Sequence, residues 1–228
     1  MMTCSIMQPT YLPWAGYFNL IAHSDIFIFL DDAQFQKSSW HSRNRILNNN
    51  SIHWITVPVK HQCLAQTIND TPIDSSQHWK RKHCNLLKHA YGKHPFAHEI
   101  LEICSFIEEI DVSTLSELNI NLLKWILQKM NISSKIILSS ETNILGRRTE
   151  RIINLLYAFN ADKYISPKGS FGYLDDDKFI EKTNINLVRQ DFNAKPYKQY
   201  KNNDFEPNLS IVDIVANIGW KLTKEYIY

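Results

Sequence analysis

The chain has 228 residues, of which 44% are hydrophobic and 21% charged, and its formal net charge is +2. This length and composition predict one large globular domain, and the small net charge argues against nucleic acid as a partner. No run of about 18 apolar residues is present, so no membrane span is expected. Four cysteines without CxxC spacing and the lack of a signal peptide predict a cytoplasmic protein.

The first thirty residues have the pattern of a βαβ unit. Residues 1–7 predict a short buried strand, residues 18–24 a helix, and residues 25–30 a second strand. The second strand is continuously apolar, which is typical of a parallel sheet covered on both faces. The chain therefore begins as an α/β protein.

Between the first strand and the helix lies an elbow, residues 8–16, that is rich in proline and aromatic residues. Pro9 and Pro13 stiffen its backbone and predict a rigid, non-repetitive loop. A stiff loop between a strand and a helix is where α/β proteins place ligands. The alternative is a packed aromatic elbow that carries no chemistry.

Apolar periodicity predicts the remaining elements. Strands are expected at 51–59, 135–138, 163–166 and 185–190, and helices at 78–91, 96–109, 113–130, 149–160 and 209–219. Ser113 is the expected N-cap of the third of these helices, and Gly219 the expected end of the last. We predict a single domain over residues 1–228. It is an α/β fold, a mostly parallel sheet with helices on both faces, and residues 78–130 form a helical insertion or subdomain.

A polar run follows the second strand. It begins with Asp31 and Asp32 and continues to Gln34 and Lys37. Ligands of open α/β sheets bind at the carboxyl ends of strands, where two acids could hold a metal, accept sugar hydroxyls or act as a base. The alternative is a pair of solvated acids that end a strand.

The segment 38–45 joins an aromatic ring, an imidazole and two guanidinium groups. Trp40 could stack on a base or a sugar ring, and Arg43 and Arg45 have the forked geometry that suits phosphate or carboxylate. The segment predicts part of a nucleotide-sugar pocket, and an exposed basic turn is the alternative.

All nine histidines lie between His23 and His98, without metal-ligand spacing. We therefore expect no metal, and the sequence identifies no cofactor. His83 follows the basic run 80–82 and is the preferred general base, because imidazole titrates near neutrality.

Two further strand ends carry polar groups. Ser139 and Ser140 close one strand and are followed by Arg147, Arg148 and Arg151, while Ser166 and Lys168 follow another strand. Hydroxyls and cations at strand ends suit a phosphate, although GxGxxG and P-loop patterns are absent. A helix cap followed by a solvated helix face is the alternative for the first group.

Several of these segments together resemble the WbqC-like protein family. The resemblance rests on Gln8-Pro9-x-Tyr11-Leu12-Pro13-Trp14-x-Gly16-Tyr17-Phe18, Ser24-Asp25, Asp32-x-Gln34-Phe35-x-Lys37-x-x-Trp40-x-x-Arg43-Asn44, Tyr197-x-Gln199 and Leu209-Ser210-x-x-Asp213. The match covers about residues 5–219. The chain departs from the pattern at Met7, where such proteins often have His, and at Ser42, where Asn is common, so roles of those side chains do not transfer.

The resemblance implies a place in the biosynthesis of surface polysaccharides of the O-antigen type. We expect a transferase that adds an acyl or aminoacyl group to a nucleotide-linked amino sugar, with an acyl donor or carrier as second partner. A non-catalytic binding or assembly protein of the same pathway is the alternative, and a homodimer is compatible with either. The expected catalytic residues are His83 and Asp32; those expected to bind substrate are Gln8, Tyr11, Trp14, Tyr17, Asp31, Gln34, Lys37, Trp40, Arg43, Asn44, Lys82, Ser139, Ser140, Arg151, Ser166 and Lys168.

Overall fold

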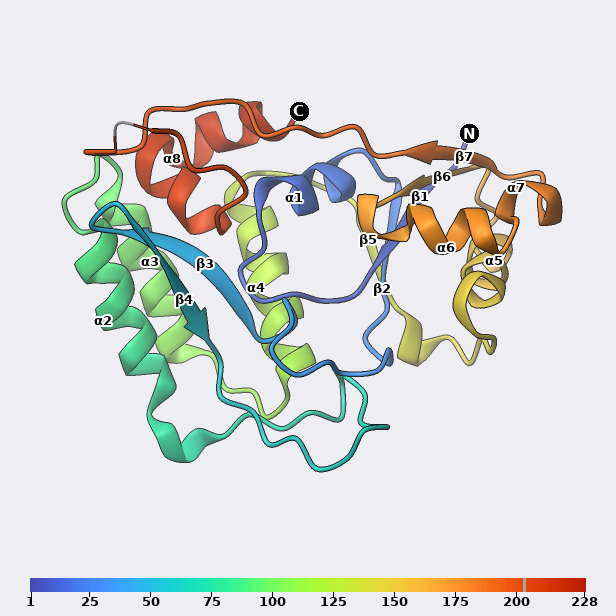
Figure 1. Cartoon of the computed structure of the whole chain (residues 1–228), viewed down its shortest axis with the longest axis horizontal. Coiled ribbons are helices and arrows are strands. Elements are labelled where there is room, and N and C mark those ends of the chain that lie inside the picture. Colours follow the sequence, from blue (N-terminus) through green and yellow to red (C-terminus); the bar gives the residue numbers. More distant parts are fainter. Residues whose placement is uncertain (203) are drawn as a thin grey trace.

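A five-stranded sheet forms the centre of the molecule in the computed structural model, which describes residues 1–202 and 204–228 (Figure 1). The strand order is β5-β2-β1-β6-β7, and every neighbouring pair is parallel. The strands are β1 (Thr3–Met7), β2 (Ile26–Phe29), β5 (Lys135–Leu138), β6 (Lys163–Ser166) and β7 (Asn186–Arg189). The predicted parallel α/β sheet is confirmed.

Helices cover both faces of the sheet because successive side chains of a strand point to opposite faces. Ile26 and Ile28 of β2 pack with α5 (Arg148–Ala158), α6 (Phe171–Asp176) and α7 (Phe179–Lys182). Phe27 and Phe29 point the other way, into the larger cluster. That cluster includes α1 (Ala15–Ala22), α4 (Leu115–Lys129) and α8 (Ile211–Ile227).

The middle of the chain is helical, as predicted. It forms α2 (Trp79–Tyr91), α3 (Ala97–Glu109) and α4, and their buried faces join the same hydrophobic cluster as α1 and α8. In Figure 1, α2 and α3 lie at the end of the molecule opposite to α5, α6 and α7. Residues 78–130 therefore share the main core, and their separate status as a subdomain stays a prediction.

One predicted helix end was wrong, and another was confirmed. The N-cap of α4 is Thr114 rather than Ser113, because the Thr114 hydroxyl accepts the Glu117 N–H and the Glu117 carboxylate accepts the Thr114 N–H, a capping box. Gly219 ends the first helical part of α8, as predicted. It has φ 77°, and the chain turns there and resumes as helix to Ile227.

A two-stranded hairpin was only half predicted. It consists of β3 (Arg43–Asn48) and β4 (Ser51–Thr56), joined through Asn49 and Asn50, which both have positive φ. That conformation suits a two-residue turn between antiparallel strands. Short 3-10 turns complete the chain at η1 (Ser75–Gln77), η2 (Ser139–Glu141) and η3 (Lys168–Ser170). Among the residues described, no helix is long and apolar enough to cross a bilayer.

The strand order identifies where a ligand is expected. The chain leaves β1 toward β2 on one side, whereas β6 lies on the other side of β1. In open α/β sheets, the crevice at such a reversal binds ligands at the carboxyl ends of the strands. Gln8 directly follows β1, and Pro167 directly follows β6.

Candidate functional site

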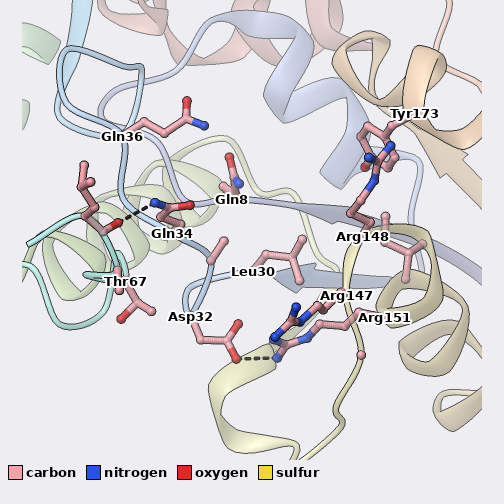
Figure 2. A pocket seen from close by; sticks show the side chains of 15 residues that line it. Gln8, Leu30, Asp32, Gln34, Gln36, Thr67, Arg147, Arg148, Arg151 and Tyr173 are labelled. Carbon is pink, nitrogen blue, oxygen red and sulfur yellow. Dashed lines mark hydrogen bonds and ion pairs between the residues drawn. The ribbon is translucent and has the colours of Figure 1, made fainter. Parts of the chain in front are cut away.

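Two adjoining cavities open at this carboxyl edge. The first, called the arginine cavity, has a volume of about 1080 Å³ (Figure 2). It is lined by Gln8, Asp32, Gln34, Gln36, Thr67, Arg147, Arg148, Arg151 and Tyr173, among others. The second, called the aromatic cavity, has about 740 Å³ and is lined chiefly by Gln8, Thr10, Trp14, Tyr17, Gln36, Trp40, His41, Asn44, Arg45, Lys168 and Phe192. Gln8 and Gln36 line both, so the cavities are neighbours.

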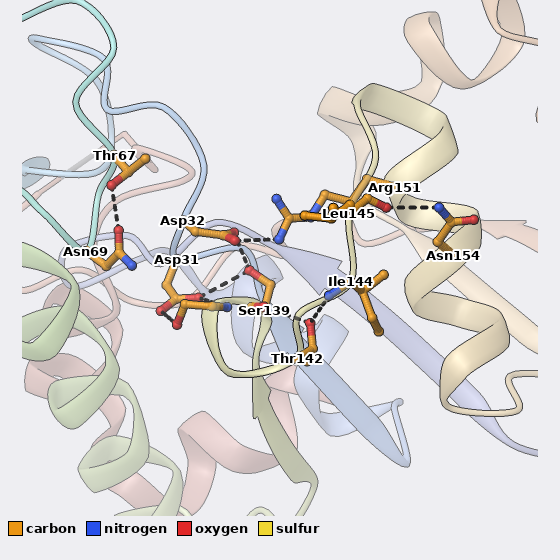
Figure 3. Close-up of polar contacts among 11 residues, drawn as sticks. Asp31, Asp32, Thr67, Asn69, Ser139, Thr142, Ile144, Leu145, Arg151 and Asn154 are labelled. Carbon is orange, nitrogen blue, oxygen red and sulfur yellow. Dashed lines mark hydrogen bonds and ion pairs between the residues drawn. The ribbon is translucent and has the colours of Figure 1, made fainter.

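The two acids that follow β2 have different roles (Figure 3). Asp31 is buried, and its carboxylate accepts hydrogen bonds from the Ser139 hydroxyl (3.2 Å), the Ser140 amide (3.0 Å) and the Ser140 hydroxyl (2.5 Å). It therefore ties the end of β2 to the end of β5. Buried carboxylates require such donors, because an unpaired buried charge is costly.

Asp32 is the acid that a ligand can reach. Its carboxylate accepts the Ser139 hydroxyl (2.5 Å) and forms an ion pair with Arg151, and its side chain remains 23% exposed. It lines the arginine cavity, whereas Asp31 does not. A carboxylate held by two donors keeps lone pairs free, so Asp32 can accept a proton or a hydrogen bond from a ligand.

The three arginines of the cavity come from the start of α5. Gly146 precedes them with φ 137°, and a Cβ at this position would lie 2.9 Å from the Cα of Arg151. Only glycine fits this close approach. Arg148 pairs with Asp177 at 3.2 Å, while Arg147 forms no ion pair with any residue that the structure describes. Figure 2 shows Arg147 and Arg151 beside Asp32.

Gln8, at the junction of the cavities, is oriented by His41. The Nδ1 of His41 accepts the Gln36 N–H (3.4 Å), so its Nε2 carries the proton and donates to the Gln8 side-chain oxygen (3.0 Å). His41 is only 4% exposed. The amide nitrogen of Gln8 donates to no described residue and is left for a ligand.

The aromatic cavity combines ring faces with polar groups. Trp14 contacts the edge of Phe192, with ring centroids 5.5 Å apart. Trp40 is 48% exposed. The hydroxyl of Thr10 is buried without a hydrogen-bond partner in the described part of the chain, and Lys168 donates to the Asn193 side chain (3.0 Å). Such a lining suits a ring-containing polar ligand.

The predicted rigid elbow is held by buried polar contacts. Asn44 donates to the carbonyls of Tyr11 (3.1 Å) and Leu12 (2.9 Å), and Ser210 donates to the Leu12 carbonyl (2.8 Å). Asn119 donates to the Pro9 carbonyl at 3.3 Å. The elbow thus forms a fixed wall of the aromatic cavity.

The structure does not bring His83 to either cavity. The ring is 5% exposed, and its nitrogens are occupied by the Tyr11 hydroxyl (2.9 Å) and the Thr56 carbonyl (2.9 Å). Burial lowers the pKa of His83 to about 4. This geometry supports a structural contact between α2 and the elbow and gives no access to a substrate proton.

Other expected binding residues are distributed as follows. Gln8, Asp32, Gln34 and Arg151 line the arginine cavity, and Gln8, Trp14, Tyr17, Trp40, Asn44 and Lys168 line the aromatic cavity. Asp31, Ser139 and Ser140 lie behind Asp32. Tyr11, Lys37, Arg43, Lys82 and Ser166 line neither cavity. Arg43 stacks on Trp54 at 4.1 Å, and Lys82 lines a separate groove on α2.

His41, Arg147 and Arg148 line the cavities but are not among the expected binding residues, although each lies in a segment that the sequence singles out. The signal for the arginines was present, because they directly precede Arg151 at the start of a predicted helix. His41 lies within the segment 38–45, yet nothing in the sequence says that it faces Gln8. Within the described residues, no three histidine, cysteine or acidic side chains gather as metal ligands.

The buried histidines predict an acid-sensitive fold. Burial lowers the pKa of both His41 and His83 to about 4, below the value of about 6.5 expected in the unfolded chain. Between these pH values the unfolded chain binds more protons, so the free energy of unfolding falls as pH falls. The slope is up to about 1.4 kcal/mol per pH unit for each histidine.

Urea unfolding between pH 7 and pH 5 measures this slope. His83→Asn should reduce the slope of the free energy of unfolding against pH by up to about 1.4 kcal/mol per pH unit, the contribution of one histidine. Equal slopes for the wild type and the variant would contradict the prediction.

The comparisons with known proteins agree with the quoted motifs. The WbqC-like protein family matches residues 8–225. An uncharacterized protein of Mycobacterium tuberculosis, Rv1507c, is 35% identical over 220 residues, which cover 94% of this chain and 93% of the relative. No solved structure matches. The chain belongs to the WbqC-like protein family.

Proposed function

We propose that the protein is a cytoplasmic transferase of surface-polysaccharide biosynthesis that transfers an acyl or aminoacyl group to the amine of a nucleotide-linked sugar. The observation that carries the proposal is the pair of chemically different cavities that meet at Gln8 and Gln36. A transfer reaction needs two substrates side by side, and this arrangement offers a place for each.

The aromatic cavity suits the nucleotide sugar. Trp14 and Trp40 offer ring faces for a base or a sugar, and Lys168 and Arg45 offer positive charge for a diphosphate. Its volume of about 740 Å³ falls in the range of small-molecule sites. The free amide of Gln8 would then contact the sugar at the junction with the arginine cavity.

Asp32 replaces His83 as the proposed general base. In the step, the sugar nitrogen attacks the acyl carbonyl and a nitrogen–carbon bond forms. The bond between the acyl carbon and its leaving group breaks, and that group departs with the electron pair. The amine proton passes to Asp32, and the Gln8 amide donates to the carbonyl oxygen as it gains negative charge.

Thermal-shift measurements with nucleotide sugars, followed by mass spectrometry with acyl donors, test the proposal. A transferase gives a stabilised protein and an acylated sugar. A thermal shift without product from any activated acyl donor would favour the alternative, a non-catalytic binding protein of the same pathway. The argument for this alternative is that the sequence contains no complete known catalytic motif.

Gly16→Ala is expected to weaken binding of a nucleotide sugar by a factor of about 10 or more, because one lost ring contact costs about 1–3 kcal/mol. A Cβ at Gly16 would lie 2.3 Å from ring atoms of Trp14, so the indole must leave its position in the aromatic cavity. The helix preference of alanine offsets part of the stability that is lost when Trp14 leaves Phe192, so the variant should remain folded.

Isothermal titration calorimetry with a nucleotide sugar that shifts the wild type measures the effect. Gly172→Ala is the matched control, because a Cβ there meets no atom within 4 Å. Wild-type affinity in Gly16→Ala would remove Trp14 from the proposed site.

A further inference from the structure

The arginine cavity is strongly cationic for its size. Its charged lining groups are three arginines and one carboxylate, which leaves an excess of two positive charges facing one space. The three guanidinium groups come from one short segment, residues 147–151. The backbone of Gly146 packs closely against that of Arg151 at the other end of this segment. The arrangement requires neither the aromatic cavity nor a transfer reaction.

Internal partners neutralise only part of the charge of these arginines. Arg147 forms no ion pair within the described ranges, although it points into the cavity beside Asp32 (Figure 2). Arg151 shares the Asp32 carboxylate with Ser139, and its Nε is buried without an acceptor among described residues. Arg148 alone has a partner outside the lining, Asp177.

We propose that the arginine cavity binds a phosphate or diphosphate group through Arg147 and Arg151. Guanidinium forks bind phosphate oxygens in pairs, and one phosphate can bridge two neighbouring forks. The Gln8 amide nitrogen, which has no partner among the described residues, supplies a further donor at the cavity edge. The inference goes beyond the proposed function, because anion binding at this site needs no catalysis.

Asp32 sets the affinity of this anion site. Its carboxylate holds Arg151 and repels an incoming phosphate, so it competes directly with the ligand. Asp32→Asn removes the charge and keeps the side-chain shape. The variant should therefore bind the anion more tightly, which a merely structural ion pair would not do.

Calorimetric titration with inorganic pyrophosphate at low ionic strength tests the site. The affinity should fall about tenfold in Arg147→Ala and in Arg151→Gln, and rise severalfold in Asp32→Asn. Arg81→Ala, an exposed arginine on α2 outside both cavities, should bind like the wild type. Arg147→Ala removes no ion pair that the structure describes, so its loss of binding cannot be ascribed to misfolding.

The same variants identify the source of the phosphate. If Arg147→Ala weakens uridine diphosphate as much as pyrophosphate, the site holds the diphosphate of the nucleotide; if only pyrophosphate weakens, it holds a phosphorylated donor. The proposal is overturned if the wild type does not bind pyrophosphate, or if both arginine variants bind as the wild type does. Pyrophosphate binding without any acylated product would contradict the proposed transferase activity and would still support the anion site.

Discussion

Asp32→Asn is expected to lower the rate of acyl transfer by a factor of about 10² to 10⁴, the usual contribution of a general base. Asparagine keeps the acceptor oxygen that Ser139 needs, but it cannot take the amine proton. Single-turnover product formation, followed by mass spectrometry, measures the effect. The fold should persist, because Asp31 and not Asp32 ties β2 to β5 through three hydrogen bonds.

The expected signature is a split between two kinetic constants. Because Asp32→Asn frees Arg151, KM for a phosphorylated donor should fall while kcat collapses. Asp175→Asn is the matched control, since this exposed carboxylate pairs with Arg189 outside both cavities and should leave kcat unchanged. A kcat within about threefold of the wild type would remove Asp32 from the role of base.

The strand ends could be predicted from the sequence because their signals are local. Continuous apolar runs stop at Asp31 and at Ser139, and parallel strands bring those stops to one edge. Which acid would face the ligand could not be predicted. That depends on η2, whose turn directs the Ser140 amide to Asp31, and the path of a turn depends on the tertiary structure.

The burial of His83 could be predicted from the sequence. Although His83 follows the basic run 80–82, it lies four residues after Trp79 and four before Leu87, on the buried stripe of α2. This periodicity is a stronger signal than the charge of the neighbouring residues. The strand β3 has no such signal, because Arg43, Asn44 and Arg45 hide its alternation.

Two quoted motifs whose residues line neither cavity form one network. Tyr197 and Gln199 both donate to the buried carboxylate of Asp213, at 2.6 and 3.1 Å. They belong to the segment between β7 and α8 that also supplies Phe192 and Asn208 to the aromatic cavity. The sequence pattern contains these residues, and only the fold explains their shared role as the attachment of one cavity wall.

Asp213→Ala is therefore expected to lower the free energy of unfolding by about 3 kcal/mol. Burial raises the pKa of Asp213, and the two donors offset part of the cost of keeping this carboxylate away from water. Alanine leaves the Tyr197 hydroxyl without this acceptor and leaves the Gln199 amide with only the Glu206 carbonyl. Urea unfolding at neutral pH measures the loss. Asp111→Ala, at an exposed position, should change it by less than about 0.5 kcal/mol.

A second readout connects this network to binding. Once Asp213 is lost, Tyr197 and Gln199 no longer fix the segment, so Phe192 loses its position against Trp14. Nucleotide-sugar affinity should then fall even at temperatures where Asp213→Ala is folded, whereas pyrophosphate affinity at the arginine cavity should not. A loss of both affinities would mean that the variant disrupts the whole sheet edge, and a loss of neither would mean that the segment needs no anchor.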